Sequence, residues 1–316
     1  MPATSPTEPL LLFEQASKWY GPVLALNQVT LELQGGITGL VGANGSGKST
    51  LIKLATGQIQ PSLGRVRVRG IDASEWSARW LIGYCPDHDA FYEDLTGRAF
   101  VLAMAKLCGF TNSDAKDRTE AALELVGMSE RADRKLRGYS KGMRQRIKLA
   151  QALLHDPAML ILDEPLAGID PLGRQEMLEL FRKLAAQGKG LLISSHELEE
   201  LEKLTGHVVI LARGRIAAVG TLAQIRERLD NFPSSVLIEL DRPRDLARTL
   251  VDADNVLGVD VAGEGKIIVR AKNPKVFYRD LGGIIARGGY NVARLEPLDD
   301  SAHAILGYLL GGRGET

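Results

Sequence analysis

A glycine-rich loop follows an apolar segment early in the chain. Residues 37–41 read Ile-Thr-Gly-Leu-Val, and the next segment reads Gly-Ala-Asn-Gly-Ser-Gly-Lys-Ser-Thr. Glycines at this spacing leave backbone N–H groups free to curl around phosphate oxygens, and the helix expected to begin near Lys48 adds its positive dipole end. Lys48 is placed to reach the β- and γ-phosphates and Ser49 to ligate Mg²⁺. The sequence therefore predicts a nucleoside triphosphate site formed by Gly42, Ala43, Asn44, Gly45, Ser46, Gly47, Lys48, Ser49 and Thr50.

Composition limits the other classes of function. Lys plus Arg and Asp plus Glu both total 39, so no net charge favours nucleic acid as a partner. The two cysteines, Cys85 and Cys108, lack metal-ligand spacing, which suits a reducing compartment and argues against a disulfide framework. No apolar stretch approaches the roughly 18–20 residues that span a bilayer, and residues 1–9 lack a signal-peptide layout. We expect an intracellular chain that reaches a membrane only through a partner.

Two kinds of pattern alternate along the chain. Apolar alternation over residues 10–33, with a turn at Tyr20, predicts antiparallel strands. Beyond the loop, strands alternate with helices, which predicts a parallel α/β core interrupted by a helical insertion at about 95–155. Beyond residue 33 the expected strands are 37–41, 66–68, 82–85, 159–162 and 191–193, with a closing hairpin over 208–220.

The length of 316 residues allows two domains. Residues 1–9 are expected to be a disordered tail, 10–231 a nucleotide-binding domain, and 232–316 a small α+β domain. The most linker-like stretch is 230–235, which contains Pro233 and two serines. The elements expected after it are strand 236–240, helix 245–251, strands 256–261 and 266–270, helix 274–287, strand 290–296 and helix 300–310.

Three polar residues follow buried strands where triphosphate chemistry needs them. Asp163 and Glu164 come directly after the apolar run 159–162. Asp163 is placed to hold Mg²⁺ through its water shell, and Glu164 to orient or deprotonate the attacking water. His196 ends the next apolar strand, where its imidazole is placed to contact the γ-phosphate.

A second candidate anion site opens the helix that follows Tyr139. Ser140 occupies the cap position and Gly142 follows in the first turn, so backbone N–H groups are exposed there. Basic residues cluster around this site, and they suit either a nucleic-acid face or a solvated face that also meets phosphate. They are Arg131, Arg134, Lys135, Arg137, Lys141, Arg144, Arg146 and Lys148. The absence of interleaved aromatic residues favours the second interpretation.

Over residues 10–225 the chain resembles the ATP-binding subunit of an ABC transporter. Gly42–Thr50 matches the Walker A loop, and residues 160–164 match the Walker B strand. The other matches are Ser140 to Met143 with the signature motif, Ala167 to Asp170 with the D-loop, His196 with the switch histidine, and Tyr20 with the aromatic residue that stacks on adenine.

Two departures from the family pattern matter. Asp87 stands where the family usually has glutamine; it is still able to ligate Mg²⁺, but it adds negative charge near the γ-phosphate. In the signature motif, Lys141 and Met143 replace a glycine and the glutamine. Such variants resemble subunits that serve ABC-2-type exporters, and residues 234–316 are loosely similar to the C-terminal extension of those subunits.

The resemblance implies an ATPase that binds ATP and Mg²⁺ and dimerises around two ATP molecules, as a homodimer or with a related subunit. Lys48, Glu164 and His196 would be catalytic, Ser49, Asp163 and Asp87 would hold the metal, and Tyr20, Ser140, Gly142 and Asp170 would complete the nucleotide contacts. Dimer closure would drive a separate integral membrane permease from the cytoplasmic face, with export favoured. Two alternatives stay open: a soluble nucleotide switch without a transport role, and a phosphotransferase kinase.

Overall fold

The computed structural model describes all residues except 1–7, 197, 222–223, 226–233, 264 and 299–316. Contacts divide the chain into two compact units, Met1–Val219 and Gly220–Thr316. Most of the expected tail, most of the expected linker and the whole of the expected helix 300–310 lie outside the described residues. Among the described helices, none is long and apolar enough to cross a membrane.

The first unit begins with an antiparallel sheet, as the alternating pattern predicts. The β1 and β2 strands pair around a turn in which Gly21 has φ +55°, a conformation that glycine adopts without strain. Strand order in the sheet is β2-β1-β4-β5. The strands are β1 (Leu11–Tyr20), β2 (Val23–Leu33), β4 (Leu63–Val68) and β5 (Ile71–Asp72).

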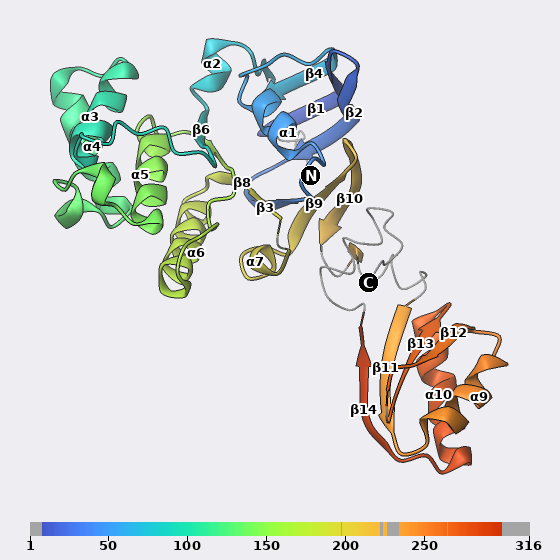
Figure 1. Cartoon of the computed structure of the whole chain (residues 1–316). Coiled ribbons are helices and arrows are strands. Elements are labelled where there is room, and N and C mark those ends of the chain that lie inside the picture. Colours follow the sequence, from blue (N-terminus) through green and yellow to red (C-terminus); the bar gives the residue numbers. More distant parts are fainter. Residues whose placement is uncertain (1–7, 197, 222–223, 226–233, 264, 299–316) are drawn as a thin grey trace, which may run out of the picture. The chain divides into compact units, whose positions relative to one another are not determined.

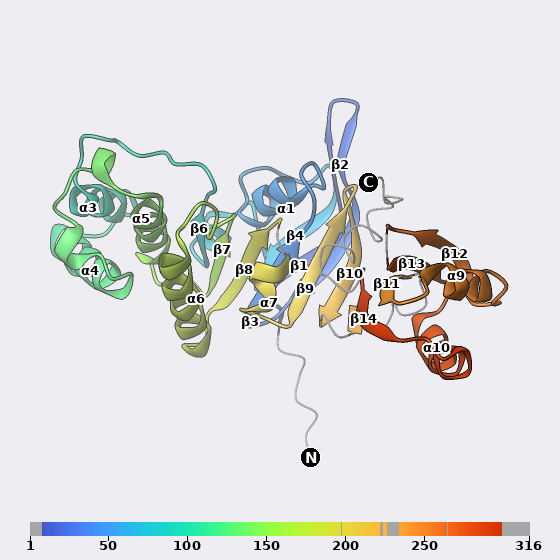
Figure 2. The same ribbon diagram turned by 60° about the horizontal axis from the view of Figure 1, so that its bottom comes forward.

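A six-stranded sheet forms the centre of this unit (Figure 2). Its order is β10-β9-β3-β8-β7-β6, and the pairs β3–β8, β3–β9, β7–β8 and β6–β7 are all parallel. Parallel strands share one carboxyl edge, so the segments that follow β3, β6, β7 and β8 meet there. The strands are β3 (Gly36–Val41), β6 (Ile82–Cys85), β7 (Met159–Leu162), β8 (Gly190–Ser195), β9 (His207–Ala212) and β10 (Arg215–Thr221).

Helices cover both faces of the parallel sheet (Figure 2). The α1 helix joins one core with both sheets, because its Leu51, Ile52 and Leu54 pack with residues such as Phe13 and Ile161. The α6 helix turns Phe181 and Leu184 inward and contacts β3 and β8. The helices of the core are α1 (Lys48–Ala55), α2 (Trp76–Arg79), α6 (Pro171–Ala186) and α7 (Leu198–Glu202).

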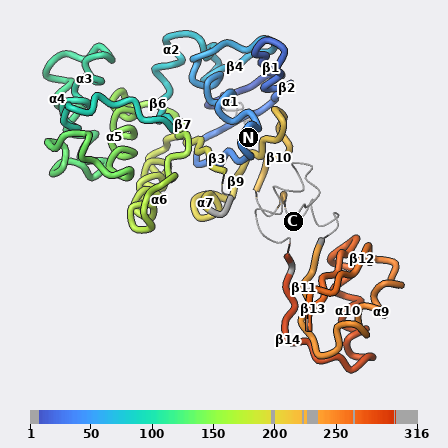
Figure 3. Tube along the Cα trace, viewed as in Figure 1, coloured from blue at the N-terminus to red at the C-terminus, as the bar shows by residue number. Residues whose placement is uncertain are grey.

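The helical insertion predicted from the sequence lies between β6 and β7, and Figure 3 traces the chain into it and back. Each α-helix has a side-chain cap: the hydroxyls of Thr96, Thr111 and Ser140 accept a hydrogen bond from the residue three positions on. Leu107 at the end of α3 is 79% exposed, whereas Phe100 and Val101 of the same helix are buried. The helices are α3 (Gly97–Leu107), α4 (Asn112–Leu125), η1 (Ser129–Arg131), η2 (Leu136–Gly138) and α5 (Lys141–Leu153).

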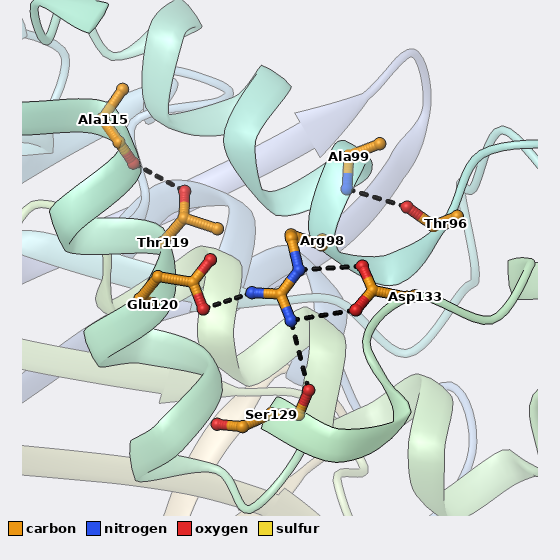
Figure 4. A network of polar contacts seen from close by, with 8 residues as sticks. All are labelled: Thr96, Arg98, Ala99, Ala115, Thr119, Glu120, Ser129 and Asp133. Atoms are coloured by element: carbon orange, nitrogen blue, oxygen red, sulfur yellow. Dashed lines mark hydrogen bonds and ion pairs between the residues drawn. The ribbon is translucent and has the colours of Figure 1, made fainter. Parts of the chain in front are cut away.

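Arg98 ties the parts of this insertion together (Figure 4). Its guanidinium lies 2.8 and 3.1 Å from the two carboxylate oxygens of Asp133 and donates to the carbonyl oxygen of Ser129 at 3.2 Å. It also pairs with Glu120 of α4. The hydrogen bonds to Asp133 and Glu120 raise the pKa of Arg98 above its ordinary value. The contacts of Arg98 connect α3 to α4 and to the segment that leads to α5.

The second unit is a small α+β structure with its own core. Its sheet has the order β12-β13-β11-β14, and β11 and β13 turn Val236, Ile238, Ile267 and Val269 toward the two helices. The C-cap Gly289, with φ +58°, ends the second helix. The elements are β11 (Ser234–Leu240), α9 (Pro243–Val251), β12 (Val256–Val261), β13 (Lys266–Ala271), α10 (Pro274–Gly288) and β14 (Val292–Pro297).

Candidate nucleotide-binding site

The glycine-rich loop joins β3 to α1, as predicted. Gly47 has φ +109°, and a Cβ there would lie 2.8 Å from the carbonyl oxygen of Ala25, so both the conformation and the space require glycine. Asn44 and Ser49 are exposed, whereas the hydroxyl of Ser46 is buried without a hydrogen-bond partner among the described residues. A loop that exposes backbone N–H groups at a helix N-terminus is suited to bind phosphate.

Lys48 is 8% exposed and lies inside this loop. Its Nζ donates to the carbonyl oxygen of Gly42 at 2.5 Å and lies 3.5 Å from that of Ala43. Burial lowers the pKa of Lys48, while the nearby carboxylates of Glu164 and Asp163 act in the opposite direction. The structure therefore brings the predicted lysine and both predicted acids into one electrostatic site.

Ser194 connects the two acidic residues, although no motif in the sequence indicated it. Its fully buried hydroxyl donates to Asp163 Oδ1 at 2.6 Å and accepts the backbone N–H of Glu164 at 2.9 Å. Burial raises the pKa of Asp163 and the bond from Ser194 lowers it. A serine directly before the polar end of an apolar strand was the available signal; its partners become visible only with β8 beside β7.

Glu164 and His196 face each other across the ends of β7 and β8. His196 Nδ1 lies 2.9 Å from Glu164 Oε2. Glu164 has φ +47°, an uncommon conformation for a residue with a side chain, of a kind that costs on the order of 1–3 kcal/mol and clusters at functional sites. The Glu164 side chain is 16% exposed and that of His196 52% exposed, so the pair borders solvent. This arrangement suits a base that orients water beside an imidazole.

The donor set fits Mg²⁺ bound together with a nucleotide. Mg²⁺ usually takes one or two carboxylates, while phosphates and waters supply its other ligands. Asp163 offers a buried carboxylate and Ser49 an exposed hydroxyl. Asp87 follows β6 at the same sheet edge, and its charge contributes to the raised pKa of Asp163. Within the described ranges no group of three or more His, Cys, Asp or Glu could form an all-protein metal site.

The remaining candidates belong to other elements than the phosphate loop. Tyr20 ends β1, is 45% exposed, and has Lys18 Nζ 5.7 Å from its ring centroid. Ser140 caps α5, and a Cβ at Gly142 would lie 3.5 Å from Ile169, so the signature turn adjoins the D-loop. Asp170 accepts the backbone N–H of Gly173 at 3.0 Å and so caps α6. Nucleotide contacts by these residues stay predictions.

Known proteins share this fold and these segments. A protein-family profile described as ABC transporter matches residues 26–167. An uncharacterised ABC transporter ATP-binding protein of Synechocystis sp. is 38% identical over 64% of the chain, and the match spans 58% of that relative. The Nod factor export ATP-binding protein I of Burkholderia pseudomallei (strain 1710b) is 35% identical over 66% of the chain and 69% of its own length.

A solved structure agrees with the family profile and with these two relatives. The ATP-binding subunit of an ABC transporter has a TM-score of 0.62 and 32% identity, and the match covers 70% of this chain and 93% of that one. Sequence identity, coverage and fold thus point to one family, and the phosphate loop, Asp163 and Glu164 lie within the residues that the family profile matches. The chain belongs to the ABC transporter ATP-binding protein family, whose members hydrolyse ATP.

Proposed function

We propose that this chain is an ATP-hydrolysing subunit that dimerises on ATP and drives a separate membrane permease. The observation that carries the proposal is the convergence of Lys48, Asp163, Glu164 and His196 at the carboxyl ends of β3, β7 and β8. ATP is the substrate. Mg²⁺, when held by Asp163 and Ser49, would neutralise phosphate charge.

The residues of the site divide the work of hydrolysis. Loop N–H groups bind the phosphates, and the Lys48 ammonium leaves its loop carbonyls to hold the terminal one. Glu164 orients the attacking water and accepts its proton, and His196 holds the Glu164 carboxylate in place. Ser194 fixes the backbone of Glu164, so the acceptor does not need to reorganise during the reaction.

The position of Ser140 supports a dimer with composite sites. Two strands, β8 and β7, separate β3 from β6, which places β6 about 14 Å from β3 at the usual strand spacing. The α5 helix lies against β6, so its cap is remote from the phosphate loop of the same chain. We propose that Ser140 and Gly142 contact the γ-phosphate bound by a second subunit, and that hydrolysis releases this contact.

Replacing Ser140 with arginine tests the composite site. We expect Ser140→Arg to bind ATP with nearly unchanged affinity and to lose ATP-dependent dimerisation, because the new side chain fills the space for the partner's nucleotide. Nucleotide titration and size-exclusion chromatography measure the two properties. Thr111→Arg is the matched control, since Thr111 caps α4 through an equivalent 3.3 Å bond. Equal loss of binding and dimerisation would place Ser140 in its own subunit's site.

A permease partner and export are proposed from the relatives. The Burkholderia pseudomallei relative is named for Nod factor export, and the chain itself has no described helix fit to cross a membrane. We propose that the subunit acts on the cytoplasmic face, against an integral membrane protein.

The loop after Asp87 is the proposed docking surface. Tyr92 is 70% exposed and Leu95 36% exposed, and such apolar groups favour burial against a partner. Phe91 differs from them, because its ring packs edge-on against Phe100 with centroids 5.0 Å apart. Phe91 therefore belongs in part to the core of the insertion, and a test of docking must leave it unchanged.

Replacing Tyr92 with alanine separates docking from catalysis. We expect Tyr92→Ala to retain the ATPase activity and melting temperature of the free subunit and to lose co-purification with a multi-span membrane protein. Leu107→Ala, which changes an exposed apolar residue outside the loop, should retain both. Full recovery of the membrane protein with Tyr92→Ala would move the docking surface elsewhere. Absence of any such partner for the unaltered chain would favour the nucleotide switch.

A further inference from the structure

Lys148 is a buried cation whose partners all belong to the loop after β6. It lies on α5 and is 3% exposed. Its Nζ donates to the carbonyl oxygens of Pro86 at 2.8 Å and Asp87 at 2.9 Å, and lies 3.0 Å from Asp89 Oδ1. An ammonium group has three donors, so these three contacts satisfy it completely. Since a buried charge is costly without partners, Lys148 and this loop hold each other in place.

Arg144 binds the other end of the same loop. Its guanidinium forms a bidentate pair with Glu93, at 2.7 and 2.8 Å, and lies 3.7 Å from Asp89. Arg144 and Lys148 are four residues apart, so they lie on one face of α5. This face of α5 therefore binds residues 86–93 at both ends. We call residues 86–93 the Asp87 loop. Residues that looked like part of a solvated basic cluster are instead structural partners of this loop.

The Asp87 loop and α5 connect two different parts of the proposed nucleotide-binding sites. The backbone N–H of Asp163 donates to the carbonyl oxygen of Cys85 at 2.9 Å, and β6 pairs with β7, so Asp87, two residues after Cys85, follows the strand end beside Asp163. At the other end, Ser140 caps α5 about 12 Å along the helix axis from Lys148. Movement of the loop relative to α5 would require breaking all three contacts of Lys148.

We infer that Lys148 is a positioning residue that makes the Asp87 loop and α5 move as one body. The inference rests on the proposed function, because it assigns Asp87 to one nucleotide and Ser140 to the nucleotide of the second subunit. A change at the metal and γ-phosphate near Asp87 is then transmitted through Lys148 to the helix that closes the dimer. Loss of Lys148 uncouples nucleotide binding from closure while the phosphate loop stays intact.

The test compares two lysines in the full-length chain: Lys148, which is buried, and Lys189, which is partly buried. Lys148→Met removes the coupling contacts. Lys189→Met is the matched control, because Lys189 also binds a carboxylate, that of Asp156 at 2.5 Å, and a carbonyl, that of Pro157 at 2.9 Å. For Lys148→Met we expect Mg-ATP affinity within about twofold of the unaltered chain, and a loss on the order of 10- to 100-fold in kcat, as small misplacements cause. ATP-dependent dimerisation of Lys148→Met should also weaken.

Further variants keep the outcome interpretable. Lys148→Gln retains N–H donors and should recover part of the dimerisation. If Lys148→Met does not fold, Asp89→Asn weakens the same contact from the loop side and is read by the same measurements. Equal kcat and dimerisation in Lys148→Met and Lys189→Met, at a temperature where both are folded, would overturn the inference. If the unaltered chain itself does not dimerise with ATP, the proposed function fails first.

Discussion

Replacing Lys48 with alanine is expected to abolish ATP turnover, with a loss of at least about 100-fold, the scale seen when one preorganised donor is removed. The ammonium is buried inside the phosphate loop, and water that fills its place in the variant supplies no positive charge. The carboxylates of Glu164 and Asp163 act on the pKa of Lys48, which is consistent with a position at the reacting end of the proposed nucleotide site. Steady-state ATPase assays and titration with a fluorescent ATP analogue measure the effect.

Lys53→Ala provides the control for Lys48→Ala. Lys53 lies in the last turn of the same helix and is exposed, so its loss changes the same net charge without reaching the loop. Thermal unfolding of both variants separates a folding defect from a binding defect. Near-normal ATPase activity in a folded Lys48→Ala variant would show that this loop is not the primary nucleotide-binding site.

Replacing Glu164 with glutamine is expected to keep ATP binding and slow hydrolysis by about 10²–10⁴-fold, the usual contribution of a general base. The amide preserves the size of the side chain and its contact with His196, 2.9 Å from the carboxylate, but it does not accept the proton of water. Because ATP then persists in the site, the variant should accumulate as a dimer with Mg-ATP. Single-turnover hydrolysis and size-exclusion chromatography measure the two effects.

Glu179→Gln, on the exposed side of α6, is the matched control and should behave as the unaltered chain. A Glu164→Gln variant that binds ATP, hydrolyses it slowly and yet stays monomeric would contradict the composite-site mechanism. Normal hydrolysis by the Glu164→Gln variant would show that another group acts as the general base. These outcomes are distinct, so one preparation tests both proposals.

The sequence was sufficient for features that depend on neighbouring residues. The phosphate loop was predictable because phosphate binding uses the backbone of one continuous segment, and Gly47 shows the conformation that this requires. The cap at Ser140 was predictable because it spans three residues. The parallel core followed from the alternation of strands and helices, and TM-score and strand order agree with that prediction.

Only the tertiary structure decided which distant side chains meet. His196 and Glu164 are 32 residues apart in sequence, and their contact depends on β8 lying beside β7. The same strand order gives Ser194 its two partners. The packing of α5 against β6 turned Lys148 from an apparent surface charge into a buried link to the Asp87 loop. The physical reason is that local periodicity specifies which face of an element is buried, whereas the residues that face it are chosen by strand order and helix packing.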